Sequence, residues 1–128
     1  MSPGPAIRRL AQLSINVHDL ERATAFYRDR LGLAFLFSAG SMAFFDLAGV
    51  RLMLALPEQK EHDHPSSILY LDVADIAASH RGLQAGGVAF EREPSLVAAL
   101  ATTDLWMAFF RDSEGNLLAL SSEVSRHG

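Results

Sequence analysis

The stretch from residue 12 to residue 33 constrains the fold of this chain more than any other, because strand, helix and stop signals follow one another within it. Its first six residues alternate polar and apolar side chains, the two-residue period of a strand with two different faces. Asp19 stands at a helix N-cap position, and apolar residues then recur every three or four places until Gly32, a typical residue after a helix end. The apolar strand face is expected to pack under this helix. The polar face of the strand carries Gln12, Ser14 and Asn16.

Three further strands complete the first half of the predicted fold. They are expected at residues 33–38, 42–46 and 50–56, and the last two form a hairpin around Gly49. Residues 58–67 are polar, charged and bracketed by prolines, which is typical of a linker. The first module is therefore predicted to span about residues 8–57.

The same order of elements restarts after this linker. Residues 68–73 read as a strand, Asp75 is placed as a second N-cap, and a helix continues to Gly86. Further strands are predicted to begin at residues 88–90 and to occupy 105–111 and 117–122, with an insertion at 91–103. Each copy is too small to bury its own sheet face. We therefore predict a single domain, residues 1–128, with an internal repeat whose second module spans about residues 68–124.

Composition narrows the classes of partner. The chain has 128 residues, a net charge of −4 and no basic run, so nucleic acid is not an expected partner. It contains no cysteine, which excludes disulfides and thiolate metal ligands and is compatible with a reducing cytoplasm. No apolar run approaches the length of a membrane span, so no membrane partner is expected. A cytoplasmic protein is the resulting expectation.

Residues 17–23, 26–27 and 31–33 together resemble the opening signature of the vicinal oxygen chelate superfamily, which contains glyoxalase I, bleomycin resistance proteins and extradiol dioxygenases. In the second half, residues 73–76, 86–88 and 110–117 look like the family's second helix and its Asp-Pro-x-Gly-Asn turn, with Ser113 in place of proline. The resemblance covers nearly the whole chain and repeats at corresponding positions.

This resemblance implies an α+β fold. Two βαβββ modules form a half-open, cup-shaped sheet with the helices outside, and many small members are homodimers, so a homodimer is expected here. Enzymatic members bind one divalent metal ion in the cup through His, Gln or Glu side chains on the first and last strands of the modules. That metal acts as a Lewis acid on two neighbouring substrate oxygens.

The metal-ligand positions that the resemblance implies hold little that binds a metal in this chain. They fall on Gln12 and Met53, with Ala55 as an alternative to Met53, and on Ile68 and Ala119. Isoleucine and alanine have no donor atom, and a thioether is a poor ligand for a hard or borderline divalent ion. We therefore expect no cofactor, and lyase or dioxygenase activity is not supported, although whether the chain is an enzyme stays open. The resemblance then favours the branch of the bleomycin resistance proteins, which hold a ligand in the same cup without a metal.

The candidate pocket consists of the residues expected to face the inside of the cup. It combines aromatic walls with a few polar groups, which is typical of a small-molecule site. Some of its members could instead face a dimer partner. The predicted pocket residues are Gln12, Ser14, Asn16, Arg51, Met53, Tyr70, Asp72, Trp106, Phe110 and Ser121.

Two alternatives to metal-free binding of a small, partly aromatic or cationic molecule stay open. The first is a metal-dependent lyase, isomerase or dioxygenase with displaced ligands, in which Gln12 joins His62 and His64 around a divalent ion. These two histidines are two residues apart and would share one face of a strand. The second alternative is a catalytically silent interaction module that uses only its dimer surface.

Overall fold

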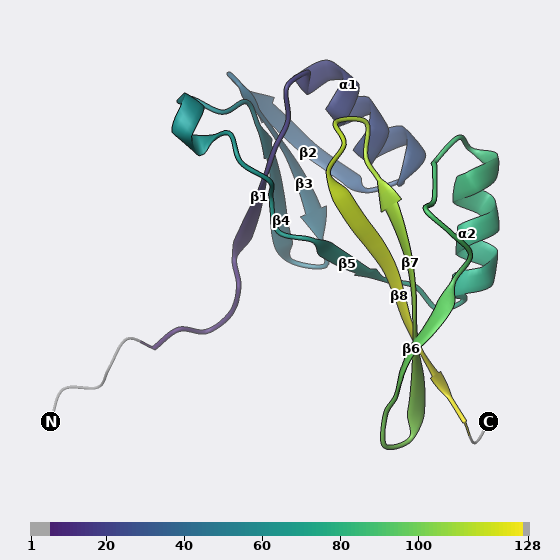
Figure 1. Ribbon diagram of the computed structural model, residues 1–128. Coiled ribbons are helices and arrows are strands. Elements are labelled where there is room, and N and C mark those ends of the chain that lie inside the picture. Colours follow the sequence, from purple (N-terminus) through teal and green to yellow (C-terminus); the bar gives the residue numbers. More distant parts are fainter. Residues whose placement is uncertain (1–5, 127–128) are drawn as a thin grey trace, which may run out of the picture.

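A computed structural model of the protein describes residues 6–126 and contains two four-stranded sheets (Figure 1). The ends of the predicted domain, residues 1–5 and 127–128, lie outside the described residues. The first sheet has the order β1-β4-β3-β2, in which β1 is parallel to β4 and the other pairs are antiparallel. Its strands are β1 (Gln12–Asn16), β2 (Ala34–Ala39), β3 (Met42–Leu47) and β4 (Val50–Ala55).

The second sheet repeats this topology with the order β5-β8-β7-β6, and β5 is parallel to β8. This repeat confirms the predicted α+β fold of two βαβββ modules, and the eight strands form two separate open sheets. The strands are β5 (Leu69–Asp72), β6 (Ser95–Ala99), β7 (Thr103–Arg111) and β8 (Leu117–Ser125).

The first helix begins where its N-cap predicts but changes its winding halfway. The Asp19 carboxylate accepts a hydrogen bond from the Arg22 N–H at 3.0 Å and caps α1 (Leu20–Ala25). The chain then continues as a π-helical segment, η1 (Phe26–Arg30), closed by a hydrogen bond from the Leu31 N–H to the Phe26 carbonyl at 3.1 Å. The predicted single helix is therefore an α-helix followed by one π-helical turn.

The second helix, α2 (Ile76–Ala85), follows the prediction more closely. Its N-cap Asp75 accepts a hydrogen bond from the Ala78 N–H at 3.1 Å, and Gly86 ends it. Gly87 takes a φ of 99°, a conformation that side-chain-bearing residues rarely adopt. The linker contains one 3-10 turn, η2 (Lys60–His62).

The second strand of the second module lies later in the chain than predicted. Residues 88–90 form no strand: Val88 is buried, and Phe90 makes an isolated bridge to Phe110 while its ring packs 4.4 Å from that of His80. β6 instead forms after Pro94, inside the segment predicted to be an insertion. The reason is that the side chains of Val88 and Phe90 pack in or against the core, whereas residues 95–99 are free to pair with β7.

One core serves both modules. Each sheet has a covered face, over which its helix packs, and an open face on the other side. The covered faces of both sheets contribute to a single apolar cluster, so the open faces lie on the outside of the molecule. The side chains at its centre include Ile15, Phe45, Leu52, Leu54, Phe110 and Leu118. In residues 6–126, no helix has the length and apolar character needed to cross a membrane.

Candidate functional site

The open face of the first sheet brings together the five predicted pocket residues of the first module. Gln12 pairs in register with Arg51, Ser14 with Met53, and Asn16 with a residue at the end of β4. Paired residues on neighbouring strands share a face, and the Gln12 Nε2 atom lies 3.8 Å from the Met53 sulfur. These side chains are exposed or half-buried, so they form an accessible polar strip along β1 and β4.

Two aromatic rings that the sequence analysis missed lie beside this strip. Phe44 of β3 pairs with Met53, and the Arg51 guanidinium lies 5.6 Å from the centre of its ring. Phe37 of β2 stacks on Phe44 with ring centres 4.6 Å apart and planes inclined by 29°. The alternation of β3 was the available signal, because Phe44 is two residues from Met42 and Asp46 on the same face.

The open face of the second sheet holds three of the predicted residues. Tyr70 and Asp72 of β5 pair with Ala119 and Ser121 of β8. Tyr70 also meets Phe109 of β7 edge to face, with ring centres 6.2 Å apart. This face therefore presents an exposed tyrosine, a carboxylate and a hydroxyl around small residues.

Trp106 and Phe110 do not share the face of these residues. In the β7–β8 hairpin Phe110 pairs with Leu118 and Trp106 with Ser122, so both point to the covered face. Phe110 is fully buried in the core, and Trp106 lines a hollow beside the start of α2. The prediction used the wrong parity of β7, because a strand register that differs by one residue exchanges the two faces.

The four implied metal-ligand positions do not fit a divalent ion. Gln12 and Met53 lie side by side and offer an amide and a thioether, whereas Ile68 and Ala119 offer no donor atom. The Ala119 side chain is completely buried between its neighbours. No step of a metal-dependent reaction can be assigned to this set of side chains.

The alternative set of Gln12, His62 and His64 is not brought together either. The Asn16 side-chain amide donates to the carbonyl oxygens of His62 at 2.7 Å and His64 at 3.0 Å. The loop that carries these histidines, residues 62–64, which we call the histidine loop, therefore lies at the end of β1 away from Gln12. Gln12 is four residues away along that strand, about 13 Å at the usual strand rise. Among residues 6–126, no three histidine or acidic side chains are grouped so as to hold a metal ion.

The histidine loop has a structural role instead. His18 Nε2 lies 2.9 Å from Asp63 Oδ1, and the Asn16 N–H donates to the Ser66 hydroxyl at 3.0 Å. Together with the two bonds of the Asn16 amide, these contacts fix the linker against the turn between β1 and α1.

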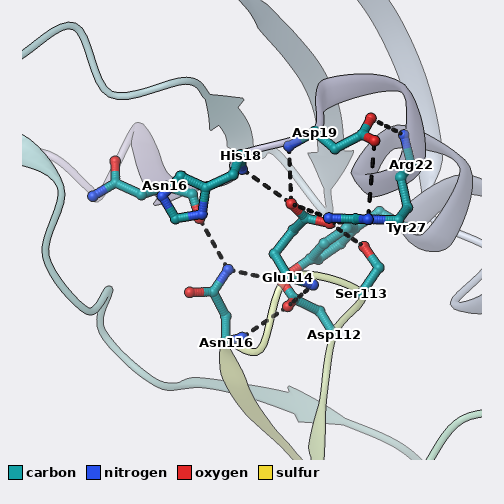
Figure 2. A network of polar contacts seen from close by, with 9 residues as sticks. All are labelled: Asn16, His18, Asp19, Arg22, Tyr27, Asp112, Ser113, Glu114 and Asn116. Carbon is teal, nitrogen blue, oxygen red and sulfur yellow. Dashed lines mark hydrogen bonds and ion pairs between the residues drawn. The ribbon is translucent and has the colours of Figure 1, made fainter.

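A polar network joins the tip of the β7–β8 hairpin to the start of α1 (Figure 2). Glu114, whose side chain is 1% exposed, accepts hydrogen bonds from the N–H groups of His18 at 3.0 Å and Asp19 at 2.9 Å. Arg22 Nε and the Ser113 hydroxyl also donate to it, at 2.7 and 3.0 Å. Burial alone would raise the pKa of Glu114, but these hydrogen bonds outweigh it and lower the pKa to about 2.

The same network continues to a buried tyrosine. The Tyr27 hydroxyl donates to Asp112 Oδ2 at 2.7 Å, and burial, reinforced by the Asp112 carboxylate, raises the pKa of Tyr27 far above its ordinary value. Asp112 also accepts from the N–H groups of Glu114 and Asn116 at 2.8 Å each. The Asn116 amide then reaches the Asn16 carbonyl at 3.0 Å. These hydrogen bonds link residues 16–27 of the first module to residues 112–116 of the second, so this network is a joint between modules.

Comparisons with known proteins agree on one superfamily. The family model described as Glyoxalase/Bleomycin resistance protein/Dioxygenase superfamily matches residues 9–120. No curated protein sequence matches the chain significantly.

Among solved structures, the chain is similar to a member of the glyoxalase/bleomycin resistance protein/dioxygenase superfamily from Sphaerobacter thermophilus, at 25% identity and a TM-score of 0.76 over 91% of this chain and 98% of that one. A lactoylglutathione lyase from Agrobacterium tumefaciens gives 20% identity and a TM-score of 0.70, over 94% and 95% of the two chains. A virulence protein from Salmonella typhimurium gives 20% identity and a TM-score of 0.76, over 92% of this chain and 98% of that one. The likenesses below 25% identity speak for the fold alone.

Proposed function

This chain belongs to the glyoxalase/bleomycin resistance protein/dioxygenase superfamily, and within it we propose that the protein binds a small, partly aromatic or cationic molecule without a metal ion. One observation carries the proposal: the four strand positions discussed above present one amide, one thioether and two side chains without donors. A bound divalent ion needs several oxygen, nitrogen or thiolate ligands. The open faces supply the chemistry of a binding surface in place of a metal centre.

The character of the ligand follows from the open faces. On the first sheet, the half-exposed ring of Phe37 stacks on the buried ring of Phe44 next to the Arg51 guanidinium, so Phe37 offers a surface on which a planar ring would stack. On the second sheet, the Asp72 carboxylate lies on the same face as Tyr70 and would attract a cationic group. These contacts support an aromatic ligand that carries a positive charge.

A homodimer is part of the same proposal. Because the covered faces share one core, a molecule bound on one open face would be left uncovered on its other side. The open face of a second copy would supply the missing wall and form the cup. The strand β2 supports this arrangement, since Phe37, which stacks on Phe44 on the open face, and the neighbouring Leu36 remain 45% and 47% exposed in the single chain. A cytoplasmic location, with which the cysteine-free composition is compatible, completes the proposal.

Metal analysis tests the metal-free part of this proposal. The protein purified without chelators should contain no stoichiometric zinc, nickel, manganese or iron, and a Gln12→Ala variant should be the same. A stoichiometric metal that disappears on this substitution would contradict the proposal.

Ligand titration tests the binding part. A panel of aromatic amines with their uncharged analogues is titrated calorimetrically into the protein and into Arg51→Ala and Tyr70→Ser variants. We expect binding that Tyr70→Ser weakens at least tenfold. Arg51→Ala should weaken the uncharged aromatic analogues, since it removes the cation beside the Phe44 ring. Arg92→Ala, at an exposed position outside the strands, should leave both unchanged. Sedimentation in the same buffer should give the mass of a dimer. A monomer at all concentrations would contradict the proposed homodimer, because no second copy would then cover the bound molecule.

A further inference from the structure

A hollow of about 430 Å³ lies between the two modules, away from the open faces. It follows β5 and is bounded by the chain after η1, the end of β3, one side of α2 and part of β8. Its volume is in the range of small-molecule sites, and most of the side chains around it are aliphatic. The aliphatic side chains around it are Leu31, Leu33, Leu47, Leu71, Val73, Leu83 and Leu120.

The free edge of β5 gives this hollow a hydrogen-bonding pair. β5 has β8 as its neighbour on one side and no strand on the other within the described residues. The Val73 N–H donates to the Ser121 carbonyl at 2.9 Å, so the N–H and C=O of Asp72, one residue earlier, point away from β8. Asp72 lines the hollow, and no other group of the described chain pairs with these two backbone groups.

Two residues of α2 face the same hollow without serving the packing of the helix. Ser79 is half-buried, and its hydroxyl makes no hydrogen bond within residues 6–126. Gly82 stands one turn later inside the helix, where glycine is unfavourable relative to alanine. A Cβ built at Gly82 would meet no atom within 4 Å, so close packing does not require glycine there. The helix therefore leaves open space and a free hydroxyl where the hollow lies.

We propose that this hollow binds a small branched aliphatic molecule that carries two secondary amides on one carbon, as a residue within a peptide does. The C=O of the first amide accepts from the Asp72 N–H, and the N–H of the second amide donates to the Asp72 C=O, as in a parallel ladder. The Ser79 hydroxyl accepts or donates a further hydrogen bond. The aliphatic part fills the space between the leucines. A charged ligand fits less well, because the Asp72 side chain belongs to the open face and no other charged residue lines the hollow. This site uses the backbone of Asp72 at the strand edge, whereas the one proposed above uses its carboxylate on the open face.

The test is an NMR titration of the isotope-labelled full chain with N-acetyl-leucine N-methylamide. A ligand of this size is expected to bind with a dissociation constant on the order of 1 mM. The largest shifts should fall on the amides of Asp72, Ser79 and Gly82. Gly82→Leu fills the hollow from a position where a side chain meets no obstacle, and it should weaken binding at least tenfold. Gly82→Ala is the matched control, since it makes the same helix change but leaves most of the space, and it should bind within about threefold of the wild type.

Two further arms separate the outcomes. N-acetyl-leucine methyl ester, which lacks the second N–H, should bind several-fold more weakly, and Ser79→Ala should weaken the amide similarly without affecting the fold. Arg51→Ala should change nothing, so failure of the open-face proposal leaves this result intact. The proposal is overturned by shifts confined to the open faces, by equal binding to Gly82→Leu, by equal binding of the ester, or by the absence of saturable shifts.

Discussion

Replacing Glu114 by glutamine removes the charge at the centre of the joint between the modules. Hydrogen bonds from Arg22 and from the N–H groups of His18 and Asp19 overcome the effect of burial and lower the pKa of this carboxyl from 4.5 to about 2. With about 1.36 kcal/mol for each pKa unit, the difference corresponds to about 3 kcal/mol of folding stability. The side chain is 1% exposed, so solvent screens this contribution little.

The pH dependence of this contribution has a definite sign. The folded-state pKa lies below the unfolded one, so the stabilisation is present above about pH 4.5 and is lost as the pH falls through about 2. Urea unfolding of wild type and Glu114→Gln should therefore differ by about 3 kcal/mol at pH 7 and by about half as much at pH 3.

A matched control is available on the surface. Glu91 pairs with Arg111 at 3.3 Å, and both side chains are about half exposed, so Glu91→Gln removes a comparable carboxylate from a solvated pair. Its cost should stay below about 1 kcal/mol. Equal losses for the two variants, or a difference between Glu114→Gln and wild type that stays constant from pH 7 to pH 3, would refute the assignment of this stability to the buried charge.

Three other predictions concern stability. Tyr27→Phe should lower the free energy of unfolding by about 1.5–3 kcal/mol at pH 7 in urea, because the Tyr27 hydroxyl donates to the buried Asp112 carboxylate. The folded-state pKa of Tyr27 is raised, so the stability linked to its proton is present below about pH 10 and declines above it. This decline should occur in the wild type but not in the variant. Gly87→Ala should lower the melting temperature because φ is 99° at this position. Gly82→Ala should instead raise the free energy of unfolding by about 0.5–1 kcal/mol. A gain in stability at both positions would contradict the argument from backbone conformation. Arg126→Ala should lower the free energy of unfolding by about 1–2 kcal/mol and accelerate amide hydrogen exchange around residues 100–103. The reason is that the guanidinium donates to the carbonyls of Leu100, Ala101 and Thr103. Unchanged exchange there would show that the turn is stable without it.

The fold was predictable because several local signals agreed. Asp19 and Asp75 cap their helices as expected, and the strands that precede them occupy the predicted places within a residue or two. The π-helical turn at residues 26–30 carries no comparable signal, since its side chains also suit an α-helix. The position of β6 depended on which of two segments packs in the core, residues 88–90 or residues 95–99. Tertiary packing decides this, and the periodicity of the sequence does not predict it.

The candidate site was predictable to the extent that each strand register was. Gln12 and Arg51 share a face because each lies opposite the apolar side of its own strand, and the two apolar sides pack in the same core. The faces of β7 depended on the register set by the hairpin at residues 112–116, and a difference of one residue moved Phe109 to the open face in place of Phe110. The joint at Glu114 could not be read locally, because its partners are 92 to 96 positions away in the chain.

The joint at Glu114 also has a consequence for the order of events during synthesis. The first module is made before residue 114 is added to the chain. At that stage α1 has its local cap, Asp19. It lacks the Glu114 carboxylate that accepts from the N–H groups of His18 and Asp19, and Tyr27 lacks its partner Asp112. The first module is thus completed by the hairpin of β7 and β8, which is made later. We expect the N-terminal half of the nascent chain to stay susceptible to protease until residues 103–125 have left the ribosome, and both halves then to become resistant at once.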